Sequence, residues 1–331
     1  MIQAVSSERY DQKPCLLQKC EGKIYFFLIK TVYLYFVKPV CKTGYRCYSK
    51  YNNMRINFKK IFSLVIFTFS LLAGDTYHVM ARDREQKYKL VFREEFNLPD
   101  GSQPNPKLWS RVPRANNLWA KWNSDTADVV FIRNGRLVCR VIPNTNPADT
   151  AMMLAGAVFT KHKFAFKYGK IEVRMRTNLQ KGNFPAAWIM PQVSGNPYRY
   201  GEVDLIEYFG NEGIARQTVH SHRTAILKKS DQKTVFMARN INRDKWHVYG
   251  LEWTPHTLVT SIDGETTGCY LKSDDPVKLE EGQWSFDRSF FIILNQSVGY
   301  GNWHAPDPQA IYETEFDWVR IYQREKDITY Y

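Results

Sequence analysis

Three carboxylates stand among apolar residues in the stretch Gly201-Glu202-Val203-Asp204-Leu205-Ile206-Glu207. The apolar positions indicate a buried strand, where unpaired charge is costly. In a regular strand the side chains alternate between the two faces, so Glu202 and Asp204 share a face and Glu207 lies on the other. A β-bulge between Asp204 and Glu207 shifts the alternation by one residue and brings all three acids to one face. We therefore predict a bulged strand, with Val203 and one of the two following apolar residues in the core.

The row of acids predicts acid/base chemistry. Neighbouring carboxylates repel one another and shift each other's pKa values, which destabilises a fold but suits proton transfer. A retaining glycosidase needs two carboxyl groups about 5 to 5.5 Å apart, one as nucleophile and one as acid and then base. The long side chains of Glu202 and Glu207 can reach that separation by leaning over Asp204. A solvated edge strand or a cation site is the alternative interpretation of the same residues.

Several segments resemble glycoside hydrolase family 16. The sequence E-V-D-L-I-E is similar to the E-x-D-x-x-E signature of that family in its bulged form. The resemblance implies that Glu202 is the nucleophile, that Asp204 assists and that Glu207 is the general acid/base. Further segments resemble the family in its usual order, within about residues 88 to 323: residues 182–191, 218–220, 249–255, 294–299, 301–303 and 317–323.

The fold class that we expect is all-β. Apolar and charged residues alternate cleanly in residues 170–176, and Asn134-Gly135 and Asp263-Gly264 are typical of hairpin turns between strands. No long stretch has the 3.6-residue period of an amphipathic helix. The family resemblance implies, more narrowly, a concanavalin-like jelly-roll β-sandwich whose concave sheet forms the substrate cleft.

Five residues are candidates for substrate binding. Trp119 and Trp122 lie in a polar loop, which favours exposure and stacking on sugar rings. Trp188 could form the floor of the cleft or belong to the core, and His220 neighbours the catalytic row in the family. Trp303 belongs to the resembling segment Gly301-Asn302-Trp303.

A structural Ca²⁺ is implied by the family and by nothing else in the sequence. The positions that resemble the family's ligands are Glu95, the carbonyl of Gly135, and Asp317. Hard oxygen ligands of this kind suit the ion. A surface carboxylate pair without metal is the alternative, and no cofactor is expected for catalysis.

The first 81 residues are expected to be separate from the enzyme. Residues 54–81 have the pattern of a signal peptide: basic Lys59 and Lys60, the apolar run 61–73 and a small-residue cleavage site that ends at Ala81. Residues 1–53 are then a non-native upstream extension, and residues 82–331 form the catalytic domain. We expect an exported monomer without a transmembrane anchor.

Net charge changes with this division. The whole chain carries +13, but residues 1–81 hold 12 of its 46 basic and 4 of its 33 acidic residues, so the remainder carries +5. That charge, without a basic cluster, gives no support to nucleic-acid binding. The partner that we expect is a polysaccharide or an oligosaccharide.

Three functions remain open from the sequence. The first is a secreted, retaining, endo-acting hydrolase of β-1,3- or mixed-linkage β-glucan. The second is an endo-β-galactanase that acts on agar, porphyran or mucin-type chains, motivated by Gln217, His222, Arg223 and the arginines of residues 111–114. The third is a non-catalytic carbohydrate-binding protein, which the intact acids argue against.

Overall fold

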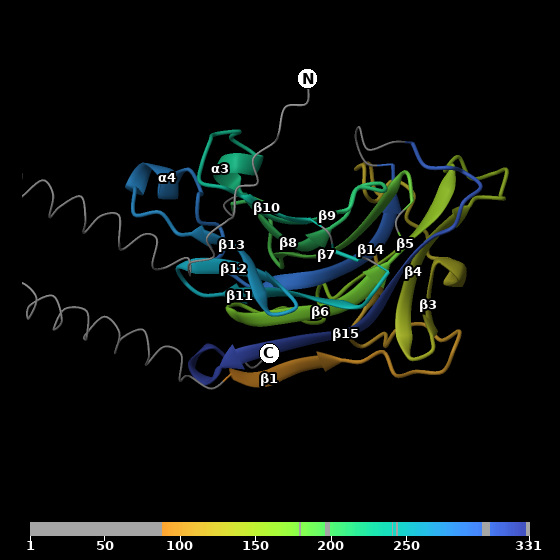
Figure 1. Ribbon diagram of the computed structural model, residues 1–331, viewed down its shortest axis with the longest axis horizontal. Helices are drawn as coiled ribbons and strands as arrows, with labels where there is room; N and C mark the ends of the chain where they lie inside the picture. The colour runs from red at the N-terminus through yellow and green to blue at the C-terminus, as the bar shows by residue number, and fades with distance from the viewer. Residues whose placement is uncertain are drawn as a thin grey trace, which may run out of the picture. The chain divides into compact units, whose positions relative to one another are not determined.

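The computed structural model describes residues 88–178, 180–195, 199–239, 241–242, 244–299 and 305–328. The predictions for residues 1–53 and 54–81, and the candidate Trp303, lie outside these residues. No helix in the described part is long and apolar enough to cross a membrane. The described chain is nearly all β, as predicted (Figure 1).

Antiparallel strands and short helices make up the described part. The elements before the acid row are β1 (Tyr88–Glu94), β2 (Ser110–Arg111), η1 (Ala127–Val129), β3 (Val130–Arg133), β4 (Arg136–Pro143), β5 (Met153–Phe159), β6 (Gly169–Thr177) and β7 (Asn183–Pro191). The acid row and the elements after it are β8 (Gly201–Glu207), β9 (Ile214–Ser221), α3 (His222–Ala225), β10 (Val235–Arg239), β11 (His247–Trp253), β12 (Thr257–Ile262), β13 (Glu265–Leu271), α4 (Pro276–Glu280), β14 (Phe290–Val298), β15 (Tyr312–Arg324) and η2 (Glu325–Asp327).

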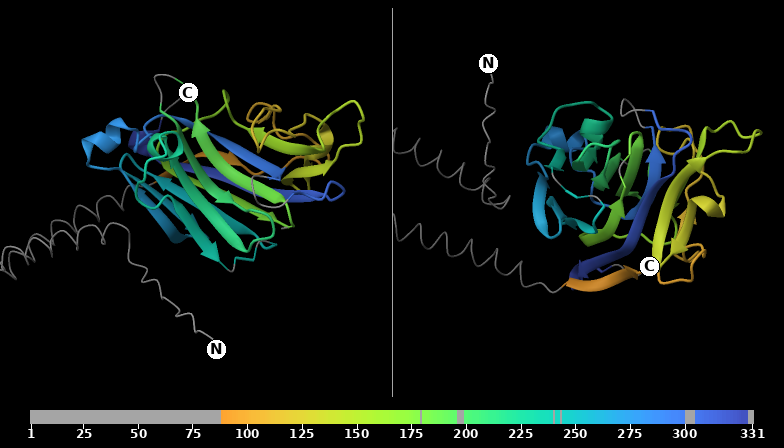
Figure 2. Two further views of the ribbon diagram at one scale, coloured as in Figure 1. Left: turned by 90° about the horizontal axis from the view of Figure 1, so that it is seen from above. Right: turned by 45° about the vertical axis from the view of Figure 1, so that its right-hand side comes forward.

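The strands form two packed layers that are joined along one ladder. We call β10-β9-β8-β7-β14-β5 the acid layer and β4-β15-β6-β11-β12-β13 the opposite layer. Figures 1 and 2 show the two layers, which are continuous because β4 pairs with β5 at Val141 and Ala155. The predicted jelly-roll sandwich is therefore confirmed, with the sheet bending from one layer into the other.

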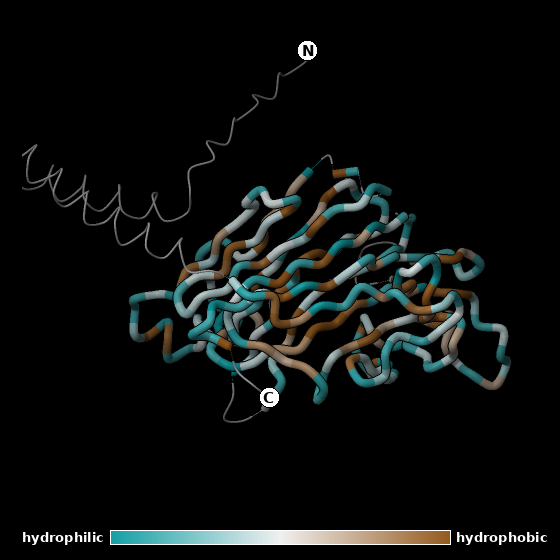
Figure 3. The backbone as a smooth tube through the Cα atoms, turned by 90° about the horizontal axis from the view of Figure 1, so that it is seen from below, coloured by the Kyte–Doolittle hydropathy of each residue, from teal (hydrophilic) through white to brown (hydrophobic). Residues whose placement is uncertain are grey.

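The core between the layers follows from strand alternation. In β6 every second residue is buried, so that Ile171, Val173 and Met175 point inward while the charges between them face solvent. The same alternation of apolar and polar residues runs along many strands in Figure 3. Burial of each such side chain contributes about 1.5–3 kcal/mol. These contacts hold the acid layer against the opposite layer.

Both predicted hairpins are confirmed. Asn134 and Gly135 join β3 to β4 with φ values of 53° and 68°, and Asp263 and Gly264 join β12 to β13 with φ values of 52° and 85°. Positive φ at both central residues is the requirement of a type I′ turn, which Asn-Gly and Asp-Gly meet at low cost.

Candidate active site

The bulge that was predicted in β8 is present. The register shifts between Asp204 and Glu207 in the ladder with β9, and the ladder with β7 passes directly from Asp204 to Ile206. Leu205 is thus the extra residue. Val203, Leu205 and Ile206 are all buried in the core, so the prediction that only one of the last two would be buried is wrong. Both residues of the bulge turn inward, and the alternation is restored one residue later.

Glu202 receives contacts from two neighbours. The hydroxyl of Tyr200, which immediately precedes β8, donates a hydrogen bond of 2.5 Å to Glu202 Oε2. His220 of β9 lies opposite Glu202, with its Nε2 3.5 Å from Glu202 Oε1 and 3.1 Å from Asp204 Oδ2. The structure therefore brings His220 to the acid row, where the sequence placed it.

Asp204 and Glu207 are in hydrogen-bond contact, and Thr218 Oγ1 donates to Glu207 Oε2 at 3.2 Å. Burial raises the pKa of Asp204 well above its usual value, and the charge of Glu202 raises it further. Burial also raises the pKa of Glu207, with Asp204 as the next cause, while His220 acts in the opposite direction. Burial therefore favours the protonated form of each of these two carboxyl groups.

The raised pKa values predict that the acid row destabilises the fold at neutral pH. Above the pKa of an unfolded Asp, about 3.9, the folded state retains protons that the unfolded chain has released. The free energy of unfolding therefore falls as the pH rises from that value to the pKa of the group in the folded state. We expect Asp204→Asn to be more stable than wild type at pH 8, with a gain that shrinks toward pH 4.

Urea unfolding at a series of pH values measures this effect, with about 1.4 kcal/mol expected for each unit by which the pKa of Asp204 is raised. Asp244→Asn, at an exposed position, is the matched control for the loss of one aspartate. A difference between Asp204→Asn and wild type that is constant across the pH range would contradict the assignment.

The aromatic candidates divide between two clusters. Trp188 faces the same side as Asp204, its partner in the ladder, and donates from Nε1 to Asn295 Oδ1 at 2.8 Å. Trp119 packs edge-on against Trp188, with ring centroids 4.9 Å apart. Trp122 instead packs on a separate apolar cluster that includes Tyr312. The predicted exposure of Trp119 and Trp122 is wrong in degree, because packing leaves each only partly exposed.

Most of the polar residues that motivated a galactanase are engaged by other residues of the protein, in the interior or at the surface. Gln217 is 1% exposed and lies on the core face of β9. Arg111 donates to backbone carbonyls of Ser124 and Thr126, Arg114 forms a bidentate pair with Asp149 and Arg223 pairs with Glu281. These side chains are therefore paired with other residues of the protein. They give no support to a positively charged site for a sulfated or hydroxyl-rich substrate.

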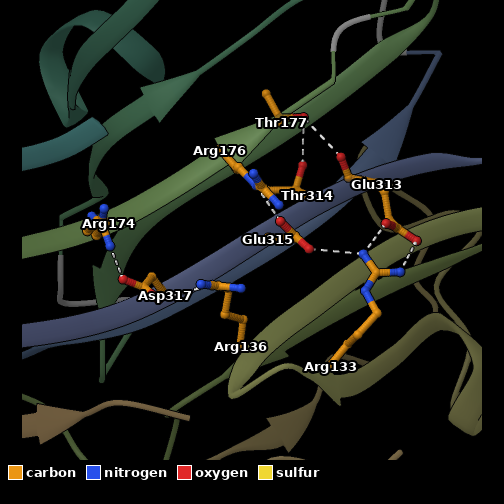
Figure 4. Close-up of polar contacts among 9 residues, drawn as sticks. All are labelled: Arg133, Arg136, Arg174, Arg176, Thr177, Glu313, Thr314, Glu315 and Asp317. Carbon is orange, nitrogen blue, oxygen red and sulfur yellow. Dashed lines mark hydrogen bonds and ion pairs between the residues drawn. The ribbon is translucent and has the colours of Figure 1, made fainter. Parts of the chain in front are cut away.

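The proposed calcium ligands do not fit a calcium ion. Asp317 lies between Arg136 and Arg174 and is paired with both (Figure 4). Glu95 is held by Arg320 at 2.9 and 3.2 Å. A guanidinium already supplies the positive charge at each carboxylate, and a dication beside it would be repelled. Figure 4 also shows the ion pairs of neighbouring Arg133 and Arg176, which extend the network along β15.

We therefore expect neither added Ca²⁺ nor EDTA to change the melting temperature. Asp317→Asn should lower it, because two arginines lose their shared carboxylate. Differential scanning calorimetry with and without the ion measures both effects. A rise in melting temperature with Ca²⁺ that Asp317→Asn abolishes would restore the metal site.

Sequence reasoning missed Tyr200 and Thr218, which contact the two glutamates at the ends of the row. The two-residue alternation of side chains along a strand could have indicated both residues. Tyr200 precedes Glu202 by two residues, and Thr218 precedes His220 by two, so each shares a face with a residue already singled out. Asn295, the partner of Trp188, lies on another strand; the segment 294–299 resembled the family, but the contact with Trp188 had no signal in the sequence.

Comparisons with known proteins agree with this geometry. The chain is 27% identical over 241 residues to the keratan-sulfate endo-1,4-beta-galactosidase of Sphingobacterium multivorum, a match that covers 71% of this chain and 55% of that protein, so it spans about half the relative's length. It is 26% identical over 281 residues to the beta-glucanase of Rhodothermus marinus, with 80% and 96% covered.

One solved structure comes from work on endo-acting O-glycanases that prominent members of the human gut microbiota express to initiate mucin breakdown. It superposes on this chain with a TM-score of 0.61 at 28% identity, and the match covers 70% of this chain and 98% of that one. The sequence profile of the glycosyl hydrolases family 16 matches residues 125–319, which include the bulged strand and all three acids. The chain belongs to glycosyl hydrolase family 16.

Proposed function

We propose that this protein is a retaining, endo-acting glycoside hydrolase that cleaves β-linkages in a polysaccharide. The observation that supports the proposal is the bulged strand β8, whose register brings Glu202, Asp204 and Glu207 to one face. A retaining mechanism needs an ionised nucleophile and a protonated acid side by side. Burial raises the pKa of Glu207, which supports its role as the acid.

In the first step Glu202 attacks the anomeric carbon. Its carboxylate, which accepts the hydroxyl of Tyr200, forms a covalent glycosyl–enzyme bond while the glycosidic bond breaks. Glu207 donates its proton to the departing oxygen, and burial, which raises its pKa, favours the protonated form that this step requires.

In the second step a water molecule attacks the same carbon from the side that the leaving group has vacated. Glu207, now ionised, removes the proton of that water, and the bond to Glu202 breaks. Asp204 is in hydrogen-bond contact with Glu207 and lies beside His220. It can therefore stabilise Glu207 as that residue changes its protonation state between the two steps. No cofactor is needed for either step.

For the substrate we place β-1,3- or mixed-linkage β-glucan first, because the match covers 96% of the β-glucanase of Rhodothermus marinus and only 55% of the galactosidase. A β-galactan is the second candidate, supported by the galactosidase relative and by the structure from work on mucin O-glycanases. A carbohydrate-binding protein without activity is disfavoured, since a binder gains nothing from a repelling row of acids. Export after cleavage at Ala81 is supported by the apolar residues 61–73.

The decisive experiment incubates the purified chain that begins at Arg82 with laminarin, lichenan, agarose, porphyran, keratan sulfate and mucin. Product sizing distinguishes internal cuts from release of terminal sugars, and NMR of the first product shows whether the anomeric configuration is retained. Binding without products from any substrate would favour the carbohydrate-binding alternative, and an inverted product would reject the roles given to the two glutamates.

A further inference from the structure

Gln217 is a buried amide with three polar partners in two layers of the sheet. It lies on the core face of β9, between Thr218 and Arg216, which face the acids. Its Nε2 donates to the carbonyl oxygen of Leu205 at 2.8 Å and to that of Ser261 at 3.1 Å. Its Oε1 accepts a hydrogen bond from Thr267 Oγ1. A buried amide with this many hydrogen-bond partners is held in one position, because the loss of any one partner would leave a buried polar atom unsatisfied and destabilise the fold.

The first partner is the bulge of the acid row. Asp204 pairs with Thr218 and Glu207 with Arg216, so two residues of β8 face Gln217 alone. A bulge interrupts the ladder and leaves its extra residue without the regular pairing. The side chain of Gln217 supplies a donor to the carbonyl of that extra residue, Leu205.

The second and third partners belong to a register shift in the opposite layer. In the ladder of β12 with β13, Thr260 pairs with Gly268 and Ser261 with Thr266, so Thr267 is the extra residue. Thr267 is held in place by Thr260 as well, at 3.0 Å between their hydroxyl oxygens. Gln217 therefore connects the irregular point of one layer to the irregular point of the other.

Water is kept away from this contact by Phe236. It is the ladder partner of Gln217 on β10 and is 4% exposed. Its ring lies so close to Gly268 that a Cβ atom added there would be 2.0 Å from Phe236 Cγ. Only glycine at that position lets β10 close over the amide, and hydrogen bonds shielded in this way are stronger than those exposed to water.

We propose that Gln217 is a positioning residue for the catalytic row, and that it fixes the bulge of β8 by tying Leu205 to Ser261 and Thr267 of the opposite layer. The proposal rests on the function proposed above. If the bulge relaxed by one residue, Glu207 would turn away from Asp204 and Thr218, because a shift of one position moves a side chain to the other face. Gln217 touches neither the acids nor the solvent, so its effect on catalysis passes through the backbone.

The test compares two buried amides. Gln217→Leu removes the three hydrogen bonds of the amide. Gln323→Leu is the matched control, because Gln323 lies on β15 of the opposite layer, is 4% exposed and donates to the carbonyls of Lys167 and Tyr168. We expect both variants to lose thermal stability. Only Gln217→Leu should lose kcat, roughly tenfold, as misplacement of a reacting group does, with KM unchanged within about twofold. Equal effects of the two variants on kcat would overturn the proposal.

Thr267→Val keeps Gln217 and removes only the hydroxyl that anchors its oxygen, so it serves if Gln217→Leu fails to fold. We expect Thr267→Val to lower kcat by a smaller factor than Gln217→Leu does, and an unchanged kcat would contradict the positioning role of Gln217. Crystal structures of both variants decide the matter independently of activity. The contact of Glu207 with Thr218, 3.2 Å here, should be lost or lengthened, and its full retention would overturn the proposal even if wild type cleaves none of the substrates.

Discussion

Replacing Glu202 by Gln is expected to reduce turnover by a factor on the order of ten thousand, comparable with the loss of a nucleophile in other covalent mechanisms. The amide has the shape of the carboxylate but cannot form the glycosyl–enzyme bond. It can still accept the hydrogen bond from Tyr200, so the fold and sugar binding should survive. Initial rates on the best substrate of the panel, together with calorimetric binding of its oligosaccharides, measure the two effects separately.

The matched control is Glu172→Gln. Glu172 lies on β6 in the opposite layer and pairs with Lys170 at 2.7 Å, away from the acid row. This variant should keep wild-type activity. Retention of more than a few per cent of the rate in Glu202→Gln would reject Glu202 as the nucleophile.

Glu207→Ala should show a loss that depends on the leaving group. General acid catalysis contributes about a hundred- to ten-thousand-fold, so hydrolysis of natural polysaccharide should fall by that order. An aryl glycoside with an acidic phenol needs no proton in the first step, and its bond should still be cleaved to form the glycosyl–enzyme. Added azide, which needs no general base, should then accelerate turnover and give a glycosyl azide with the configuration of the substrate.

Rate measurements on both substrates with and without azide, and NMR of the azide product, test the assignment. Thr218→Val is a useful comparison, since it removes only the hydroxyl that donates to Glu207 and should retain activity on both substrates without azide rescue. Equal losses on both substrates in Glu207→Ala, with no effect of azide, would point to another residue as the acid.

The local chemistry of the chain could be predicted from the sequence. Alternation in residues 170–176 predicted which face of β6 is buried, and the two hairpins followed from the positive φ that Asn-Gly and Asp-Gly accept. The bulge of β8 followed from the same period, because three acids can share one face only if one residue is extra. Each of these predictions depends on residues that are neighbours along the chain.

Partners distant along the chain could not be predicted. Gln217 meets Thr267 across 50 residues and Arg174 meets Asp317 across 143. A polar side chain in a strand is equally consistent with a substrate contact, a metal ligand or an internal hydrogen bond. That is why Gln217 was expected near the substrate but lies in the core, and why the sequence did not show that Asp317 pairs with two arginines.

The sequence by itself determined the strands, their turns and the row of three acids, because backbone sterics and the two-residue period act between neighbours. Only the tertiary structure decided which side chains are free to act. Pairing of β8 with β9 brought His220 and Thr218 to the acids, and packing of the two layers enclosed Gln217. Burial within those layers then raised the pKa values of Asp204 and Glu207, since desolvation depends on everything that surrounds a group in space.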